Sequence, residues 1–128
     1  MLKRCCCSLL LVSSGIAGAV SWDFVGYSGD SSYFADVSTI RRTDSIAMIW
    51  SLREGGIDSS NPHEVSASAL SLLEYRCGAR FFRVREAARF SEPMGTGSLL
   101  AEDIEASEWF EFEADTIAHD FWLLACGF

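Results

Sequence analysis

A single cysteine stands among arginines in the stretch Glu74 to Arg83, which reads EYRCGARFFR. Neighbouring arginines can turn a thiol into a nucleophile, provided that a general base lies close to it. His63 and His119 are the only histidines that could act as that base. They are also poor metal ligands, because they lie far apart in the sequence and Asp120, beside His119, would point in another direction on a helix. The pattern therefore favours neither catalysis nor a metal site at Cys77, and we expect no cofactor.

The first residues of the chain are typical of an export signal. Lys3 and Arg4 precede an apolar run, and small residues follow that run. This order is that of a cleaved signal peptide, and the run is too short to be a stable membrane span. We expect residues 1–21 to be the signal peptide and residues 22–128 to be one exported domain without a membrane span, located in the periplasm, on the cell surface or outside the cell. The alternative is a retained N-terminal anchor.

Cleavage of that signal would change the cysteine count from five to two. The mature chain would keep Cys77 and Cys126 only. A lone pair of cysteines in an exported chain indicates a disulfide, because the compartment is oxidising. We therefore predict a Cys77–Cys126 bond, which would close a loop of roughly 50 residues and stabilise the fold by about 4 kcal/mol on the chain-entropy model.

The charge of the chain excludes one class of partner. The sequence has 10 basic and 18 acidic residues, for a formal charge of −8. Loss of Lys3 and Arg4 would leave 8 basic residues and a charge of −10. Nucleic acid is excluded as a partner because no concentrated basic surface is available to displace counterions from phosphates.

The hydrophobic pattern predicts a sheet followed by one helix. Strand-like segments cover residues 22–25, 33–37, 45–52, 65–91 and 109–112, whereas residues 99–107 are ambiguous. In the third segment Ile46, Met48, Trp50 and Leu52 share one face. At the C-terminus Ile117, Phe121 and Leu124 recur at helical spacing, with Asp115 as the N-cap and Gly127 as the stop. The predicted class is α+β, with an antiparallel sheet of five or six strands and a C-terminal helix packed on one face.

In the long segment 65–91, the alternation of side chains between the two faces of the sheet determines whether the arginines point to solvent. Apolar residues change parity between Cys77 and Phe82, and such a change requires an extra residue or a turn. Gly78 and Ala79 are the natural place for it, so Cys77 would face the core. We then expect three arginines of the following strand to share its solvent face: Arg83, Arg85 and Arg89.

The ordered residues of the mature chain resemble those of the bacterial surface-adhesin protein E family. The resemblance rests on YFADVSTIRR, IAMIWSL, EYRCGARFFRV and SEPMGTG, and on the combination of Asp36, Trp50, Cys77, Arg80, Gly97, Trp109 and Cys126. It implies a PAS-like domain in which a disulfide joins the sheet to a C-terminal helix. It also implies a protein partner such as a host extracellular-matrix protein. Unlike in a lipid-anchored adhesin, no lipoprotein cysteine follows the apolar run.

The arginines give the first functional hypothesis, a non-enzymatic binding domain. Of the group Arg76, Arg80, Arg83, Arg85 and Arg89, the last three would form a surface for a protein partner. The polar loop Glu54 to His63 would belong to the same surface. The alternative is that these arginines pair with carboxylates of the acidic segment Glu102 to Asp115.

A second hypothesis is a periplasmic small-molecule-binding or sensing domain. Its pocket would lie between the sheet and the helix, lined by Trp50, Phe82 and Trp122. In either case exposed edge strands would allow a homodimer.

Overall fold

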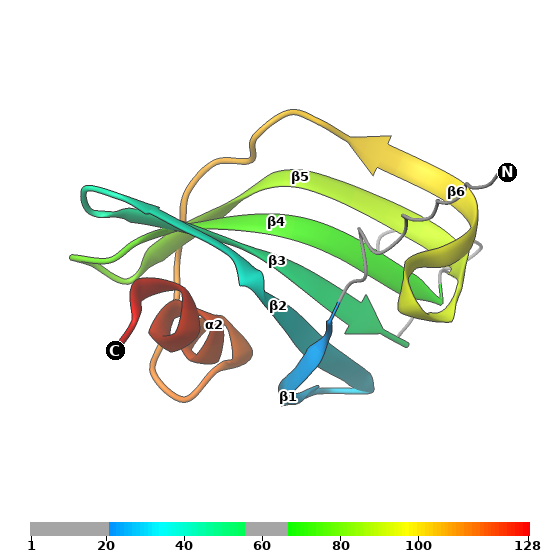
Figure 1. Ribbon diagram of the computed structural model, residues 1–128, viewed down its shortest axis with the longest axis horizontal. Coiled ribbons are helices and arrows are strands. Elements are labelled where there is room, and N and C mark those ends of the chain that lie inside the picture. The colour runs from blue at the N-terminus through cyan, green and yellow to red at the C-terminus, as the bar shows by residue number, and fades with distance from the viewer. Residues whose placement is uncertain (1–20, 56–66) are drawn as a thin grey trace, which may run out of the picture.

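The computed structural model describes residues 21–55 and 67–128. Within them, seven strands form one antiparallel sheet, and a helix follows (Figure 1). The elements are β1 (Asp23–Ser28), β2 (Ser31–Thr43), β3 (Ile46–Glu54), β4 (Ser68–Arg76), β5 (Phe81–Glu92), the 3-10 turn η2 (Pro93–Gly95), β6 (Thr96–Asp103), β7 (Phe110–Glu111) and α2 (Ile117–Cys126). The predicted signal peptide and most of the loop Glu54 to His63 lie outside the described residues.

The sheet is a meander in the order of the sequence, β1-β2-β3-β4-β5-β6, and the short β7 pairs with the start of β5. The predicted class, an antiparallel sheet with a C-terminal helix, is confirmed. The strand count exceeds the predicted five or six because the ambiguous segment 99–107 contributes to β6. The edge strands of the meander, β1 and β6, are those that would allow a homodimer. The PAS-like likeness stays a prediction.

Helix α2 covers one face of the sheet and creates the core. Ala47, Ile49 and Tyr75 of the sheet are fully buried, together with Ala125 of the helix, and Phe121 is almost so. The Tyr75 hydroxyl donates a hydrogen bond to the Ala118 carbonyl of α2 over 2.8 Å. Burial raises the pKa of Tyr75 far above its usual range, and the Asp120 carboxylate adds to the effect. This phenol is therefore a neutral structural donor.

The helix begins one residue later than the sequence predicts. Thr116, rather than Asp115, is the N-cap, and its Oγ1 accepts the backbone N–H of His119 over 3.2 Å. Asp115 has a φ of 64°, in the left-handed region, so it turns the chain before the helix instead of capping it. Gly127 ends α2 with a φ of 79°, as predicted, because glycine adopts this conformation without steric cost.

Candidate functional site

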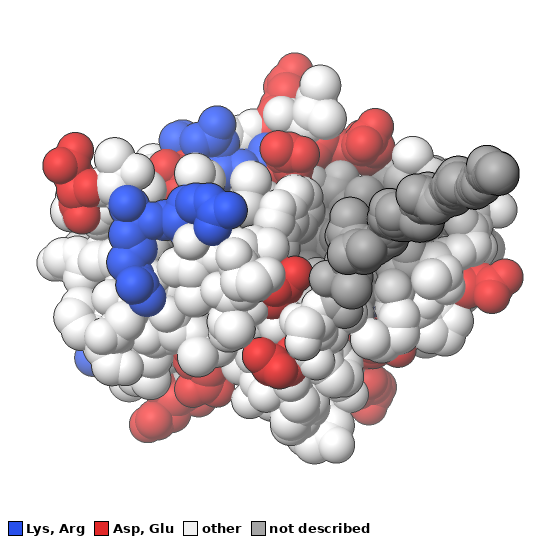
Figure 2. All heavy atoms as spheres, viewed as in Figure 1, with Lys and Arg blue, Asp and Glu red and all other residues white. Residues whose placement is uncertain are grey.

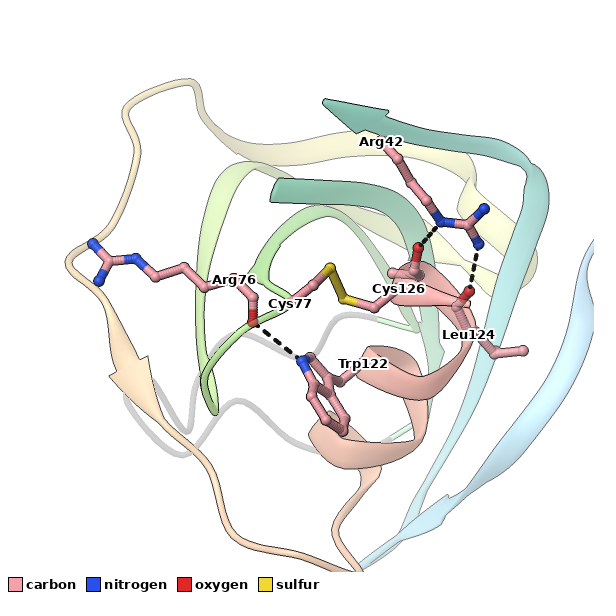
Figure 3. The surroundings of a disulfide bond; sticks show 7 residues. Arg42, Arg76, Cys77, Trp122, Leu124 and Cys126 are labelled. Carbon is pink, nitrogen blue, oxygen red and sulfur yellow. Dashed lines mark hydrogen bonds between the residues drawn. A yellow bond between two sulfur atoms is a disulfide. The ribbon is translucent and has the colours of Figure 1, made fainter. Parts of the chain in front are cut away.

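A disulfide joins the sheet to the end of α2 (Figure 3). It links Cys77 to Cys126, the pair predicted from the sequence, with an S–S distance of 2.06 Å. Cys77 lies in the turn after β4, and its backbone N–H donates to the Ser45 carbonyl in the neighbouring β2–β3 turn over 2.8 Å. No free thiol is present in residues 21–55 and 67–128. The sulfurs therefore fix the structure at the end of the sheet where both hairpins turn.

Two side chains, one of the helix and one of the sheet, fasten the same end of the helix. The Trp122 indole N–H donates to the Arg76 carbonyl over 3.1 Å. Arg42 donates from Nε to the Ala125 carbonyl over 2.7 Å, and from Nη2 to the Leu124 carbonyl over 3.3 Å. The two bonds from Arg42 satisfy carbonyls that a helix C-terminus otherwise leaves without donors. The two hairpins and the helix end thus form one braced unit.

A glutamate of β4 pairs with two of the predicted surface arginines. Arg83 Nε lies 2.7 Å from Oε1 of Glu74, and Arg85 Nη1 lies 3.3 Å from the same oxygen. Glu74 is buried and lies directly across the ladder from Arg83. The expected pairing with local carboxylates therefore exists, but its acid comes from the adjacent strand and not from the segment Glu102 to Asp115.

Arg89 does not share the face of Arg83, so the prediction of one common arginine face is wrong. The ladder pairs Leu73 with Val84 and Leu72 with Glu86, which leaves Arg85 as an extra residue on β5. Such a bulge reverses the facing of every side chain beyond it. Arg89 consequently lies opposite Ala69, on the face that α2 covers, whereas Arg83 lies opposite Glu74 on the other face.

A tryptophan from a distant segment completes the arginine cluster. The Arg76 guanidinium carbon lies 4.2 Å from the centroid of the Trp109 ring, and that of Arg83 lies 4.6 Å from it. Trp109 reaches this place because β7 pairs with Phe81 and Phe82 at the start of β5. Arg76 also lies 5.9 Å from the Phe81 ring. The sequence signal for this contact is weak, since Trp109 is 33 positions from Arg76.

Arg76 and Arg80 have no carboxylate partner among the described residues, and both are exposed. We call the group Arg76, Arg80, Arg83, Arg85 and Trp109 the arginine end. On the face shown in Figure 2, basic side chains gather on the side of the molecule where the β2–β3 and β4–β5 hairpins turn. Acidic side chains are scattered over the same view, some of them beside the basic groups, as expected for a protein that is acidic overall.

A hollow of about 260 Å³ lies between the sheet and α2. Its lining includes Tyr33, Ser51, Leu73, Phe82 and Phe121 and is mostly apolar. The predicted lining is only partly correct. Phe82 contributes, but Trp50 pairs with Leu72 on the opposite face of the sheet, and Trp122 stacks on His119 near the helix end.

Two further site types find no support in the described part of the chain. It contains no group of three or more His, Cys, Asp or Glu residues placed to hold a metal ion. It also contains no helix that is long and apolar enough to cross a bilayer.

The fold and the disulfide define a small antiparallel-sheet domain with a C-terminal helix bonded to it. The family model of surface-adhesin protein E matches residues 22–127, and the chain belongs to this family, which is one of surface proteins. One solved structure of Haemophilus influenzae protein E is similar with a TM-score of 0.58 and 15% identity, over 74% of this chain and 80% of that one. Protein E from non-typeable Haemophilus influenzae has a TM-score of 0.57 and 13% identity, over 91% and 83% of the two chains. No curated protein matches the sequence.

Proposed function

We propose that this protein is an exported, non-enzymatic binding domain that contacts a protein partner through the arginine end. The observation that carries the proposal is the contact of the Arg76 and Arg83 guanidinium groups with the Trp109 ring. Arg76 and the nearby Arg80 are exposed and have no carboxylate partner in the described residues. Membership of the surface-adhesin family supports binding rather than catalysis. Display on the cell surface fits the family description better than retention in the periplasm.

The chemistry of this surface suits an acidic segment of another protein. The energetic hot spots of protein interfaces are enriched in tryptophan, tyrosine and arginine. The Arg76 guanidinium is already oriented by stacking on Trp109, so it loses less conformational freedom when it binds a carboxylate. Because the rest of the chain is acidic, a local basic end would also orient an incoming acidic partner. A host extracellular-matrix protein is the partner class that we propose.

Within this surface, the paired arginines have a different task from the exposed ones. Glu74 neutralises part of the charge of Arg83 and Arg85 and fixes their position. Arg83 in turn contacts the same Trp109 ring as Arg76 does. We therefore place the contact itself on Arg76 and Arg80, and treat Arg83 and Arg85 as residues that hold the surface in shape. Arg89 lies on the other face and is left out.

The proposal can be tested with the exported protein and a panel of immobilised matrix proteins, by surface plasmon resonance. Arg76→Ser and Arg80→Ser should each weaken binding about tenfold, which corresponds to about 1.4 kcal/mol. Arg89→Ser is the matched control, because it removes the same charge from an arginine that lies on the opposite face of the sheet. Wild-type affinity in both variants, or an equal loss in the control, would show that this surface is not the contact.

The hollow under α2 supports a second candidate, the binding of a small apolar molecule. Its volume of about 260 Å³ approaches the lower limit of typical ligand sites. A Ser71→Phe variant would place a ring in this space. Compounds that raise the melting temperature of the wild type but not of this variant would support the second candidate. A library that leaves the wild type unshifted would argue against it.

A further inference from the structure

A second pocket lies on the sheet face opposite to α2, away from both the arginine end and the hollow. It has a volume of about 210 Å³ and is lined by Trp22, Asp36, Thr39, Trp50 and Leu70. Asp36 and Trp50 are direct cross-strand partners on β2 and β3. Trp22 immediately precedes β1, whose first residue pairs with Ala35. The pocket therefore combines two indole rings with one carboxylate.

The carboxylate of Asp36 is buried, with 6% of the residue exposed. Its Oδ1 accepts two hydrogen bonds, from the backbone N–H of Ser38 over 3.0 Å and from the Ser38 hydroxyl. Its Oδ2 accepts none from any described residue. The nearest arginine in sequence, Arg41, donates to the carbonyls of Ser38 and Ile40 instead. A buried carboxylate oxygen without a donor is costly, and so it points to a donor that a ligand would bring.

The pocket is built before any ligand arrives. The β2–β3 ladder is interrupted between Asp36 and Arg41, so residues 37–40 leave the regular strand. Thr39 fixes this excursion, because its hydroxyl donates to the Asp36 carbonyl over 2.6 Å and accepts the Trp50 backbone N–H over 3.1 Å. The carboxylate and the Trp50 wall are thus tied to the same threonine, which limits the ordering that binding requires.

We propose that this pocket binds a primary alkylammonium group. The ammonium would donate an N–H to Oδ2 of Asp36, and the ring faces of Trp22 and Trp50 would attract its positive charge. The carbon chain would pack against the same two rings. A guanidinium is less suitable, since Oδ1 already accepts two donors and the fork could not bond both oxygens. A quaternary ammonium has no N–H to offer Oδ2. The site is independent of the arginine end and of its proposed acidic partner.

The test uses n-butylammonium and the 15N-labelled exported protein, with the indole N–H resonances followed by NMR. We expect saturable shifts of the Trp22 and Trp50 signals, and at least tenfold weaker binding of tetramethylammonium and of neutral n-butanol. Asp36→Asn should also weaken butylammonium binding at least tenfold, while it keeps an oxygen to accept from Ser38. Asp44→Asn is the matched control, because it removes a carboxylate from the β2–β3 turn, where the φ of 55° suits asparagine.

Trp22→Ala is a second pocket variant. Trp22 precedes the first strand, so its replacement leaves the strand ladder intact. A folding defect in Asp36→Asn would therefore not decide the outcome. It too should lower the affinity for butylammonium. A lysine-containing peptide and 1,5-diaminopentane distinguish the two sources of the group, a protein side chain and a free amine. The proposal is overturned if butylammonium gives no saturable shift, if tetramethylammonium binds equally well, or if both pocket variants bind as the wild type does.

Discussion

Replacement of Cys77 and Cys126 by alanine is expected to destabilise the protein without undocking α2. The helix keeps three other attachments to the sheet, through the Tyr75 hydroxyl, the Trp122 indole and the Arg42 guanidinium. Phe121 and Ala125 of the helix are buried as well. The native structure should therefore survive, and the main effect of the change should be on the unfolded chain.

The size of the effect follows from the length of the closed loop. The cysteines are 49 positions apart, which on the chain-entropy model gives a stabilisation of about 4 kcal/mol. A domain of this size has a free energy of unfolding of about 5 to 15 kcal/mol, so the double variant should lose a large part of it. Its unfolded state should also be more expanded, which increases the slope of unfolding free energy against urea.

The assay is urea unfolding, followed by tryptophan fluorescence, with and without a reductant. Reduced wild-type protein should unfold at the same urea concentration as the double variant, and reductant should not affect the variant. The reasoning would be refuted by a loss below about 1 kcal/mol with native near-ultraviolet circular dichroism retained. A different failure, loss of the native spectrum in the variant, would show that the three hydrogen-bonded attachments are too weak to hold α2 without the bond.

Two further predictions concern groups around α2. Thr116→Ala should lower the free energy of unfolding by about 1 kcal/mol because it removes the N-cap, whereas Asp115→Asn should be close to neutral. A Thr116→Ala variant that is as stable as the wild type in urea unfolding would contradict this assignment. Tyr75, whose pKa is raised by burial and by Asp120, stays neutral in the folded protein at a pH where an unfolded tyrosine ionises, so stability should fall as the pH rises above about 10. Tyr75→Phe should reduce this fall. The assignment would be contradicted if the urea midpoint of unfolding decreased equally with pH in the two proteins above pH ~10.

Features set by local residues could be predicted from the sequence. The Cys77–Cys126 bond required only a count of cysteines and an export signal, and the end of α2 at Gly127 required only helical spacing and a glycine. The N-cap was misplaced by one residue because Asp115 and Thr116 are both good capping residues. The choice between them depends on the left-handed backbone of Asp115, which composition does not determine.

Features set by pairing between strands were harder to predict. The bulge at Arg85 depends on how β5 aligns with β4, and no residue type in β5 marks it, so Arg89 was assigned to the wrong face. The alternation of Trp50 with its neighbours was correct, but alternation does not tell which face the helix covers. Here the helix packs on the smaller residues of β3, Ala47 and Ile49, and leaves Trp50 to the opposite pocket.

The attachments of α2 have a consequence for the order in which the chain folds. The residues that hold the helix to the sheet lie 43 to 83 positions before their helical partners. A helix of ten residues is marginal by itself, so α2 should become stable only after β2, β3 and β4 have assembled to receive it. Until then the Cys77 thiol remains accessible to other thiols and to oxidants. Oxidation to the native disulfide should therefore be a late step, whose rate is governed by the docking of the helix.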